Sequence, residues 1–261
     1  MASLLTSLDT QGVATLILNR PEVHNAFDDA VIGELNSAIG KFAKHPDVRL
    51  LVLRAEGKSF SAGADLGWMK RMASYSREDN LADALELERL MRGLYDFPKP
   101  TIAVVQGAAY GGAVGLVSCC DIAIASEQAS FALSEAKLGL APAVISPFVI
   151  AAIGARQASR YFLTAERFSA ATARELGLVH EVVTPEALDA AQAKMVDTLL
   201  ANGPVALMAA KALLRKVAAA TSPDIAAYTT ELIASLRTSQ EGQEGLGAFF
   251  EKRQPAWQKK N

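Results

Sequence analysis

The chain has 261 residues, of which 51% are hydrophobic and 21% are charged, so it is long enough to bury one large core or a core with an appended region. Its 26 basic and 28 acidic side chains give a formal net charge of −2, which excludes the strong positive field that recruits nucleic acid. The first residues lack the basic region and long apolar run of a secretory signal, and no stretch resembles a membrane span, so we expect a cytoplasmic protein without a membrane partner.

Strands and helices are predicted to alternate in the first part of the chain. Short apolar runs predict strands at residues 13–18, 50–54 and 101–106. Apolar side chains at helical spacing predict two amphipathic helices between them, one carrying Phe27, Val31, Leu35, Ile39 and Phe42 and one carrying Leu81, Leu85, Met91 and Leu94. Such a βα succession is typical of parallel strand pairing.

The end of the chain has a helical pattern only. From about Pro185 onward the predicted helices cover residues 188–200, 205–217 and 225–236, with a last piece that ends at Phe250. Large apolar side chains lie close to the C-terminus, among them Phe249 and Phe250. A monomer would bury them with difficulty, so this region is predicted to mediate assembly.

A run of small residues, Gly107 to Gly115, follows the strand candidate 101–106 and precedes an apolar helix start. A strand, a glycine turn and a helix N-terminus together present bare N–H groups to an anion or oxyanion, although such glycines also serve close packing alone. Two other glycine motifs are excluded. Tyr110 breaks the G-x-G-x-x-G spacing of dinucleotide-binding folds, and Val52 stands where a phosphate-binding loop ending in Gly57-Lys58-Ser59 needs its first glycine.

The same architecture occurs a second time, where the strand candidate 50–54 runs through a turn into Phe60-Ser61-Ala62-Gly63-Ala64-Asp65-Leu66. Two N–H groups, one near Ala64 and one near Gly112, are therefore predicted to converge on a single oxygen, as an oxyanion hole requires.

Glu135 is a solitary acid among apolar neighbours, twenty residues past Gly115. An apolar setting raises the pKa of a carboxyl group and suits it to proton transfer next to a carbonyl. The alternative is a surface glutamate that opens a helix after Ser134.

Six motifs follow one another along nearly the whole chain: Asn19-Arg20-Pro21 with Asn25-Ala26-Phe27, residues 60–65, Lys99-Pro100-Thr101-Ile102-Ala103, residues 107–115, Cys120-Asp121-Ile122 and Phe250-Glu251-Lys252-Arg253. Together they resemble the enoyl-CoA hydratase/isomerase (crotonase) family. The resemblance implies an α/β fold with a ββα spiral core at residues 1–190, which binds an acyl-CoA and carries the catalytic site. It also implies a C-terminal helical trimerisation region at residues 191–261, and hence a homotrimer or a hexamer.

The resemblance assigns roles to individual residues. The N–H groups of Ala64 and Gly112 become the oxyanion hole for an acyl-CoA thioester substrate, and Glu135 becomes the catalytic glutamate. The implied substrate-binding residues are His24, Ala62, Gly63, Asp65, Leu66 and Gly111. Coenzyme A is part of the substrate, so no dissociable cofactor is expected, and the three histidines lie too far apart in sequence to predict a metal site.

One position departs from the family pattern. Hydratases of this family usually carry a second catalytic glutamate three residues past the second glycine of the Gly-Gly pair, and this chain has Gly115 there. A Δ3-Δ2 enoyl-CoA isomerase is therefore an alternative to an enoyl-CoA hydratase, because one base suffices to move a proton from one carbon to another. A non-catalytic acyl-CoA-binding relative is the alternative that is not an enzyme.

Several short segments are most similar to bacterial methylglutaconyl-CoA hydratase-type members: Trp68-Met69, residues 111–116, residues 118–121 and residues 140–148. This similarity implies hydration of a branched or carboxylated 2-enoyl-CoA such as 3-methylglutaconyl-CoA, a step of leucine degradation. A substrate with a second carboxylate needs a cation near its acyl end, and the candidates are Lys70, Arg71 and Lys137.

Overall fold

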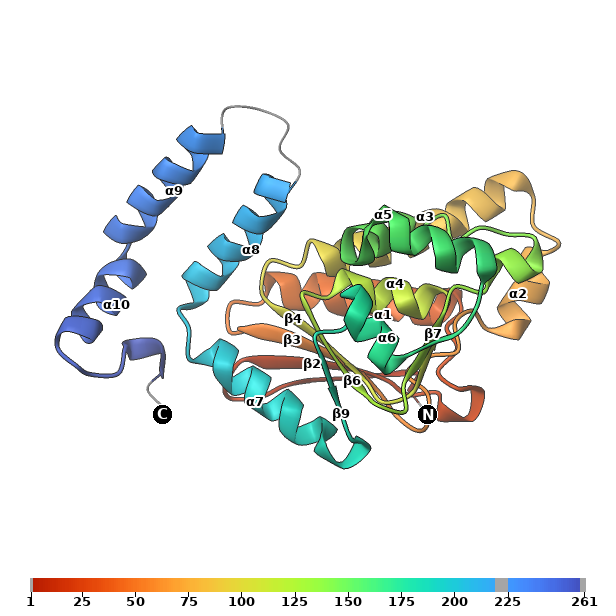
Figure 1. Ribbon diagram of the computed structural model, residues 1–261, viewed down its shortest axis with the longest axis horizontal. Coiled ribbons are helices and arrows are strands. Elements are labelled where there is room, and N and C mark those ends of the chain that lie inside the picture. The colour runs from red at the N-terminus through yellow and green to blue at the C-terminus, as the bar shows by residue number, and fades with distance from the viewer. Residues whose placement is uncertain (1, 219–224, 259–261) are drawn as a thin grey trace.

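The computed structural model describes residues 2–218 and 225–258, and its larger sheet has 6 strands in the order β1-β2-β3-β4-β6-β9 (Figure 1). The strands are β1 (Leu4–Leu8), β2 (Val13–Leu18), β3 (Leu50–Ala55), β4 (Thr101–Val105), β6 (Ile122–Ser126) and β9 (Glu181–Val183). β1 and β2 are antiparallel, and each later pair in this sheet is parallel. The parallel pairing expected from the alternating pattern is confirmed.

A smaller sheet has 3 strands, which are β5 (Ala108–Tyr110), β7 (Ser130–Ala132) and β8 (Phe168–Ser169). β5 follows β4 and β7 follows β6 after only a few residues, so the chain steps repeatedly from the larger sheet to the smaller one. After β3 the step is reduced to an isolated parallel bridge between Ser61 and Ala109 of β5. These repeated steps form the ββα spiral that the resemblance implied.

Four long helices lie on one side of the larger sheet (Figure 1). They are α1 (Asp29–Lys44), α3 (Arg77–Tyr95), α4 (Gly112–Cys119) and α5 (Ser146–Thr164), and two shorter ones are α2 (Leu66–Met72) and α6 (Ala170–Leu176). α1 forms where the sequence predicted it, because its apolar positions line one buried stripe and the Asp28 carboxylate accepts the Val31 N–H at its start. α4 is buried from Ala113 to Cys119, whereas Gly112 at its N-terminus is partly exposed.

The helix α7 (Leu188–Leu200) packs on the other face of the larger sheet. Its buried residues Leu188, Ala191 and Val196 join a cluster with Val52 of β3 and Ile124 of β6. The domain boundary expected at residue 190 therefore falls inside a helix that packs on the spiral core.

The last three helices, α8 (Pro204–Ala218), α9 (Ile225–Thr238) and α10 (Gln240–Phe250), extend away from the core (Figure 1). Buried Lys211 of α8 holds them to the core through an ion pair with Asp121 and a hydrogen bond of 3.0 Å to the Lys99 carbonyl. The Phe249 and Phe250 side chains of α10 are 76% and 75% exposed. The extended arm thus presents large apolar side chains to the outside of this chain.

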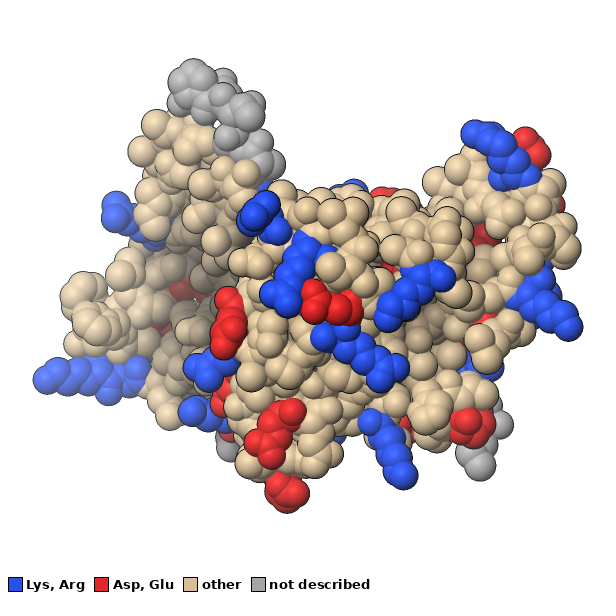
Figure 2. All heavy atoms as spheres, turned by 45° about the vertical axis from the view of Figure 1, so that its right-hand side comes forward, with Lys and Arg blue, Asp and Glu red and all other residues tan. Residues whose placement is uncertain are grey.

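Basic and acidic side chains are interspersed over the face in Figure 2, in keeping with the small net charge. Within residues 2–218 and 225–258, no helix is both long and apolar enough to cross a membrane.

Candidate active site

The turn after β3 leaves one backbone donor unused. In residues 62–65, three of the four successive N–H groups are occupied: Ala62 donates to the His24 carbonyl at 2.9 Å, Gly63 to the Ser61 hydroxyl at 3.1 Å and Asp65 to the Phe27 carbonyl at 3.1 Å. The fourth, that of Ala64, meets no acceptor among the described residues. The predicted donor is therefore the one that the fold leaves free.

The turn after β5 leaves a second donor unused. Gly111 has a φ of +54°, which favours glycine, and its N–H donates to the Ala132 carbonyl at 2.8 Å. Gly112 is the first residue of α4, and no side chain caps this helix, so the Gly112 N–H finds no acceptor in the described part of the chain. A Cβ on Gly112 would lie 2.6 Å from Cζ of buried Phe27, so a side chain here would collide with that ring.

The two turns run side by side. The Ser61 N–H donates to the Ala108 carbonyl at 2.9 Å, and the Tyr110 N–H donates to the Ser61 carbonyl at 3.0 Å. Ala64 and Gly112 each come three residues after the paired residues Ser61 and Ala109. Parallel turns in this register carry both free N–H groups to the same end of the spiral, which is the arrangement that an oxyanion hole needs.

The carboxyl group of Glu135 lies beside these turns. Glu135 begins a short 3-10 helix, Glu135–Leu138, after β7, and a Cβ on Gly111 would lie 3.3 Å from its Oε1. Its Oε2 is buried and has no hydrogen-bond partner in the described residues. Burial raises the pKa of Glu135, against a smaller opposing effect of its own backbone N–H. A carboxyl group with a raised pKa keeps and exchanges its proton at a higher pH than an exposed carboxyl group does.

The position of the absent second glutamate is filled by other side chains. A Cβ on Gly115 would collide with Cγ2 of Ile145 and would lie 2.9 Å from its Cβ and 3.1 Å from Sδ of Met91. Gly115, Ile145 and Met91 are all buried. This side of the site is therefore apolar and closely packed.

The predicted substrate-binding residues have different environments. Gly63 and Gly111 lie in the two turns, and His24 is exposed with its Nδ1 3.1 Å from the Ser59 hydroxyl. The Leu66 side chain is 82% exposed. Asp65 instead uses its carboxylate within the protein: burial opposes its ionisation, but hydrogen bonds from the Trp68 and Gly67 N–H groups and the charge of Arg20 together lower its pKa.

The candidate cations and the Tyr110 hydroxyl, which lies next to Gly111 in the chain, have different surroundings. Arg71 pairs with Asp29 at 2.6 Å, whereas Lys70 and Lys137 make no ion pair within the described residues. The Tyr110 hydroxyl lies 2.9 Å from that of Ser130 and is engaged there.

The sequence did not predict that Phe27 packs against Gly112 or that Ile145 packs against Gly115. Phe27 does belong to the first of the six motifs. The described residues contain no group of three or more His, Cys, Asp or Glu placed to hold a metal ion.

The spiral core and the paired turns define a crotonase-fold protein. The sequence profile of the enoyl-CoA hydratase/isomerase family matches residues 9–260, and the chain belongs to this family. The crystal structure of an enoyl-CoA hydratase from Shewanella pealeana is 51% identical, covers 98% of this chain and 96% of its own, and superposes with a TM-score of 0.94.

Two further relatives are named as a hydratase and as an isomerase. The 2,3-dehydroadipyl-CoA hydratase of Escherichia coli is 32% identical and matches over 98% of both chains. The trans-2-decenoyl-[acyl-carrier-protein] isomerase of Streptococcus mutans is also 32% identical and matches over 94% of both chains. Similarity of this degree extends to hydratases and to isomerases alike.

Proposed function

We propose that this protein is an enoyl-CoA hydratase, which adds water across the double bond of a 2-enoyl-CoA thioester. The observation that carries the proposal is the pair of unused N–H groups, at Ala64 and Gly112, beside the buried carboxyl group of Glu135. The two donors bind the thioester oxygen. Their preorganised dipoles stabilise the negative charge that forms on this oxygen, and loss of one such donor costs about 3 kcal/mol in the barrier.

Glu135 moves the proton in both directions. As a carboxylate it takes a proton from water while the water oxygen bonds to C3, and the electrons of the double bond move to the thioester oxygen as an enolate. The protonated Glu135 then returns its proton to C2 as the carbonyl re-forms. The raised pKa of Glu135 supports both halves of this cycle, since the group must accept and release a proton at the same pH.

The acyl group is a branched or carboxylated one, such as 3-methylglutaconyl. This choice rests on the segments similar to methylglutaconyl-CoA hydratase-type members, and the dicarboxylic acyl group in the name of the Escherichia coli relative supports it. Because Ile145 and Met91 fill the place of a second glutamate, the carboxylate of the substrate helps to hold the attacking water. Lys137 is exposed, makes no ion pair among the residues that the structure describes, and lies two residues after Glu135; it is the cation that binds this carboxylate.

A Δ3-Δ2 enoyl-CoA isomerase is the second candidate. The apolar packing around Gly115 favours it, because a site with one carboxylate is sufficient for moving a proton between two carbons. The isomerase of Streptococcus mutans supports the same reading. A non-catalytic acyl-CoA-binding protein is the third candidate, but it gives no role to the Glu135 carboxyl group beside the two turns.

One labelling experiment separates these candidates. The enzyme is incubated with 3-methylglutaconyl-CoA in heavy-oxygen water, and a hydratase yields labelled 3-hydroxy-3-methylglutaryl-CoA. Absence of label from this substrate and from crotonyl-CoA, together with rapid conversion of a 3-enoyl-CoA to its 2-enoyl isomer, would establish the isomerase instead. Binding without turnover of any of these thioesters would leave the binding protein.

We further propose that the protein assembles as a homotrimer or a hexamer in the cytoplasm. The exposed Phe249 and Phe250 of the extended α8–α10 arm support assembly, because a neighbouring copy would cover them. The proposed chemistry requires no metal and no dissociable cofactor, since coenzyme A enters as part of the substrate.

A further inference from the structure

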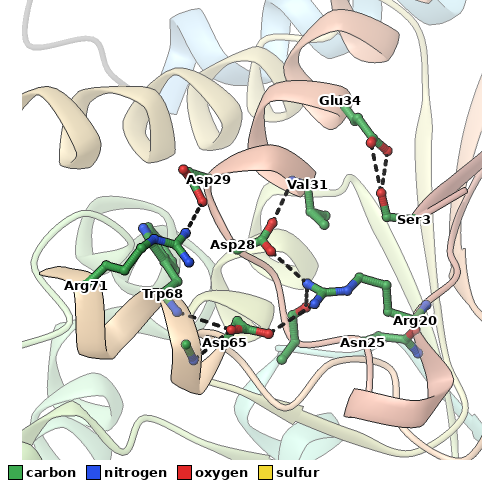
Figure 3. A network of polar contacts seen from close by, with 12 residues as sticks. Ser3, Arg20, Asn25, Asp28, Asp29, Val31, Glu34, Asp65, Trp68 and Arg71 are labelled. Carbon is green, nitrogen blue, oxygen red and sulfur yellow. Dashed lines mark hydrogen bonds and ion pairs between the residues drawn. The ribbon is translucent and has the colours of Figure 1, made fainter.

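The Arg20 side chain lies between two helix-capping residues, Asp28 and Asp65, and the second of these belongs to the turn after β3 (Figure 3). Asp28 caps α1 and Asp65 caps α2, in each case with Oδ1 accepting from N–H groups of the first turn. The second oxygen of each carboxylate faces the guanidinium: Nη1 of Arg20 lies 3.1 Å from Oδ2 of Asp28, and Nη2 lies 3.1 Å from Oδ2 of Asp65. One planar cation thus joins both helix N-termini.

This junction includes Asp65, the residue that follows Ala64 and its free N–H group. Phe27 pairs with Ala64 through two backbone bonds, in which its N–H donates to the Gly63 carbonyl at 2.9 Å and its carbonyl accepts from the Asp65 N–H at 3.1 Å. Arg20 holds the residue next to each partner of this bridge. It holds Asp65 on one side, and on the other its Nη1 also donates to the Ala26 carbonyl at 2.9 Å.

We propose that Arg20 is a positioning residue, which aims the Ala64 N–H at the thioester oxygen by locking the two segments of this bridge together. The inference rests on the proposed function, since it takes the Ala64 N–H as a donor to the substrate. Without the guanidinium, the Asp28 and Asp65 carboxylates would face each other unpaired and would repel. The turn at Ala64 would then relax, and its N–H would no longer point at the thioester oxygen on which negative charge develops.

A lysine cannot reproduce this junction. The two nitrogens of the guanidinium reach two carboxylates and a carbonyl from one plane, whereas an ammonium group is a single point of charge on a flexible stem. Arg20→Lys is therefore expected to keep the positive charge between the two carboxylates while leaving the turn loose.

The chain also contains a matched control. Arg71 of α2 pairs with Asp29 of α1 at 2.6 Å, and so ties the same two helices together without touching either cap carboxylate (Figure 3). Both side chains of this pair are about half exposed, at 50% and 55%. Loss of this pair removes an arginine and an interhelical contact but leaves the bridge at Ala64 in place.

The test reads the polarisation of a bound carbonyl group. The CoA thioester of 4-(dimethylamino)cinnamate absorbs at longer wavelength when its carbonyl oxygen receives strong hydrogen bonds. We expect a red shift on binding to the wild-type protein and to Arg71→Met. Arg20→Met and Arg20→Lys should lose most of this shift, and their kcat should fall by about tenfold or more while KM stays within about threefold, because an interaction specific to the transition state is weakened.

The outcomes separate this inference from the proposed function. A full red shift in folded Arg20→Met would overturn the positioning role while leaving the oxyanion hole intact. No shift in the wild-type protein would instead refute the oxyanion hole, and the inference with it. If Arg20→Met does not fold, the double variant Arg20→Met with Asp65→Asn removes the repulsion between the two carboxylates and keeps a good N-cap on α2. This variant should fold and still lack the shift, and recovery of the shift would count against the proposal.

Discussion

The close packing around Gly115 makes a substitution there a sensitive test of the site. In Gly115→Ala, the new Cβ would collide with Cγ2 of Ile145 and lie 2.9 Å from its Cβ, well inside ordinary carbon contact. Ile145 is buried and β-branched, so its χ1 has little freedom to yield. Overpacking of this kind costs about 1–3 kcal/mol, and the better helix propensity of alanine returns about 1 kcal/mol. A contact this short falls at the upper end of the overpacking range, so we expect a net loss of about 2 kcal/mol in the free energy of unfolding.

Thermal unfolding at a fixed protein concentration measures this loss. For a chain of this length, each kcal/mol lowers Tm by roughly 2–4 °C. The matched control is Gly33→Ala in α1, where a Cβ meets nothing within 4 Å, so helix propensity alone should leave Tm unchanged or higher.

A double-mutant cycle identifies the responsible contact. Ile145→Ala alone should destabilise the protein by about 2–5 kcal/mol, because it leaves a cavity. Its combination with Gly115→Ala should lose less than the sum, with a coupling of about 0.5–3 kcal/mol. A Gly115→Ala protein as stable as the wild type, or an additive cycle, would refute the view that Ile145 occupies the place of the second glutamate.

Four other variants test the remaining claims. Glu135→Gln should remove most turnover and leave acyl-CoA affinity within a few-fold, and near wild-type rates would contradict the role of Glu135. Because burial raises the pKa of Glu135, the folded state binds its proton more tightly than the unfolded state does. The stability of the wild type relative to Glu135→Gln should therefore fall as pH rises from about 4.3 through the raised pKa. If urea unfolding gives the same difference in free energy of unfolding between the two proteins at every pH in this range, the shift is contradicted. Gly112→Pro deletes one oxyanion donor and should lower turnover by about a hundredfold or more if the variant folds; full activity would place the oxyanion hole elsewhere. Lys137→Gln should raise KM for 3-methylglutaconyl-CoA and not for crotonyl-CoA, and equal effects on both would exclude Lys137 as the carboxylate-binding cation. Light scattering at micromolar concentration should give a trimer or hexamer for the wild type and a smaller species for Phe249→Ser with Phe250→Ser, whereas a monomeric wild-type protein would contradict the assembly.

The local spacing of apolar residues was sufficient to predict the longer strands and helices. The strand expected at residues 13–18 is β2, and the helix expected at residues 188–200 is α7, because regular apolar spacing fixes both the type of element and the face that it buries. The three-residue strands β5 and β7 are too short to carry a period, and they became visible only through their pairing.

The two glycine turns were recognised from sequence as places where backbone N–H groups face a ligand, since a strand, a glycine turn and a helix start are local features. The local pattern places the donors only near Ala64 and Gly112, and it is the family resemblance that assigns those two N–H groups; which N–H in each turn stays free is decided by the tertiary structure. That depends on acceptors from distant segments, such as the His24 and Phe27 carbonyls that occupy the N–H groups of Ala62 and Asp65.

The sequence by itself determined the family, the alternation of the longer strands and helices, the solitary Glu135 and the glycine that replaces a second glutamate. Only the tertiary structure decided what surrounds them: that Ile145 packs against Gly115, and that Arg20 joins the caps of α1 and α2 beside Ala64. The reason is physical. A motif records the residue types that neighbouring positions require, whereas Arg20 and Asp65, which are 45 positions apart, are brought together by the turns of the spiral, which no local pattern encodes.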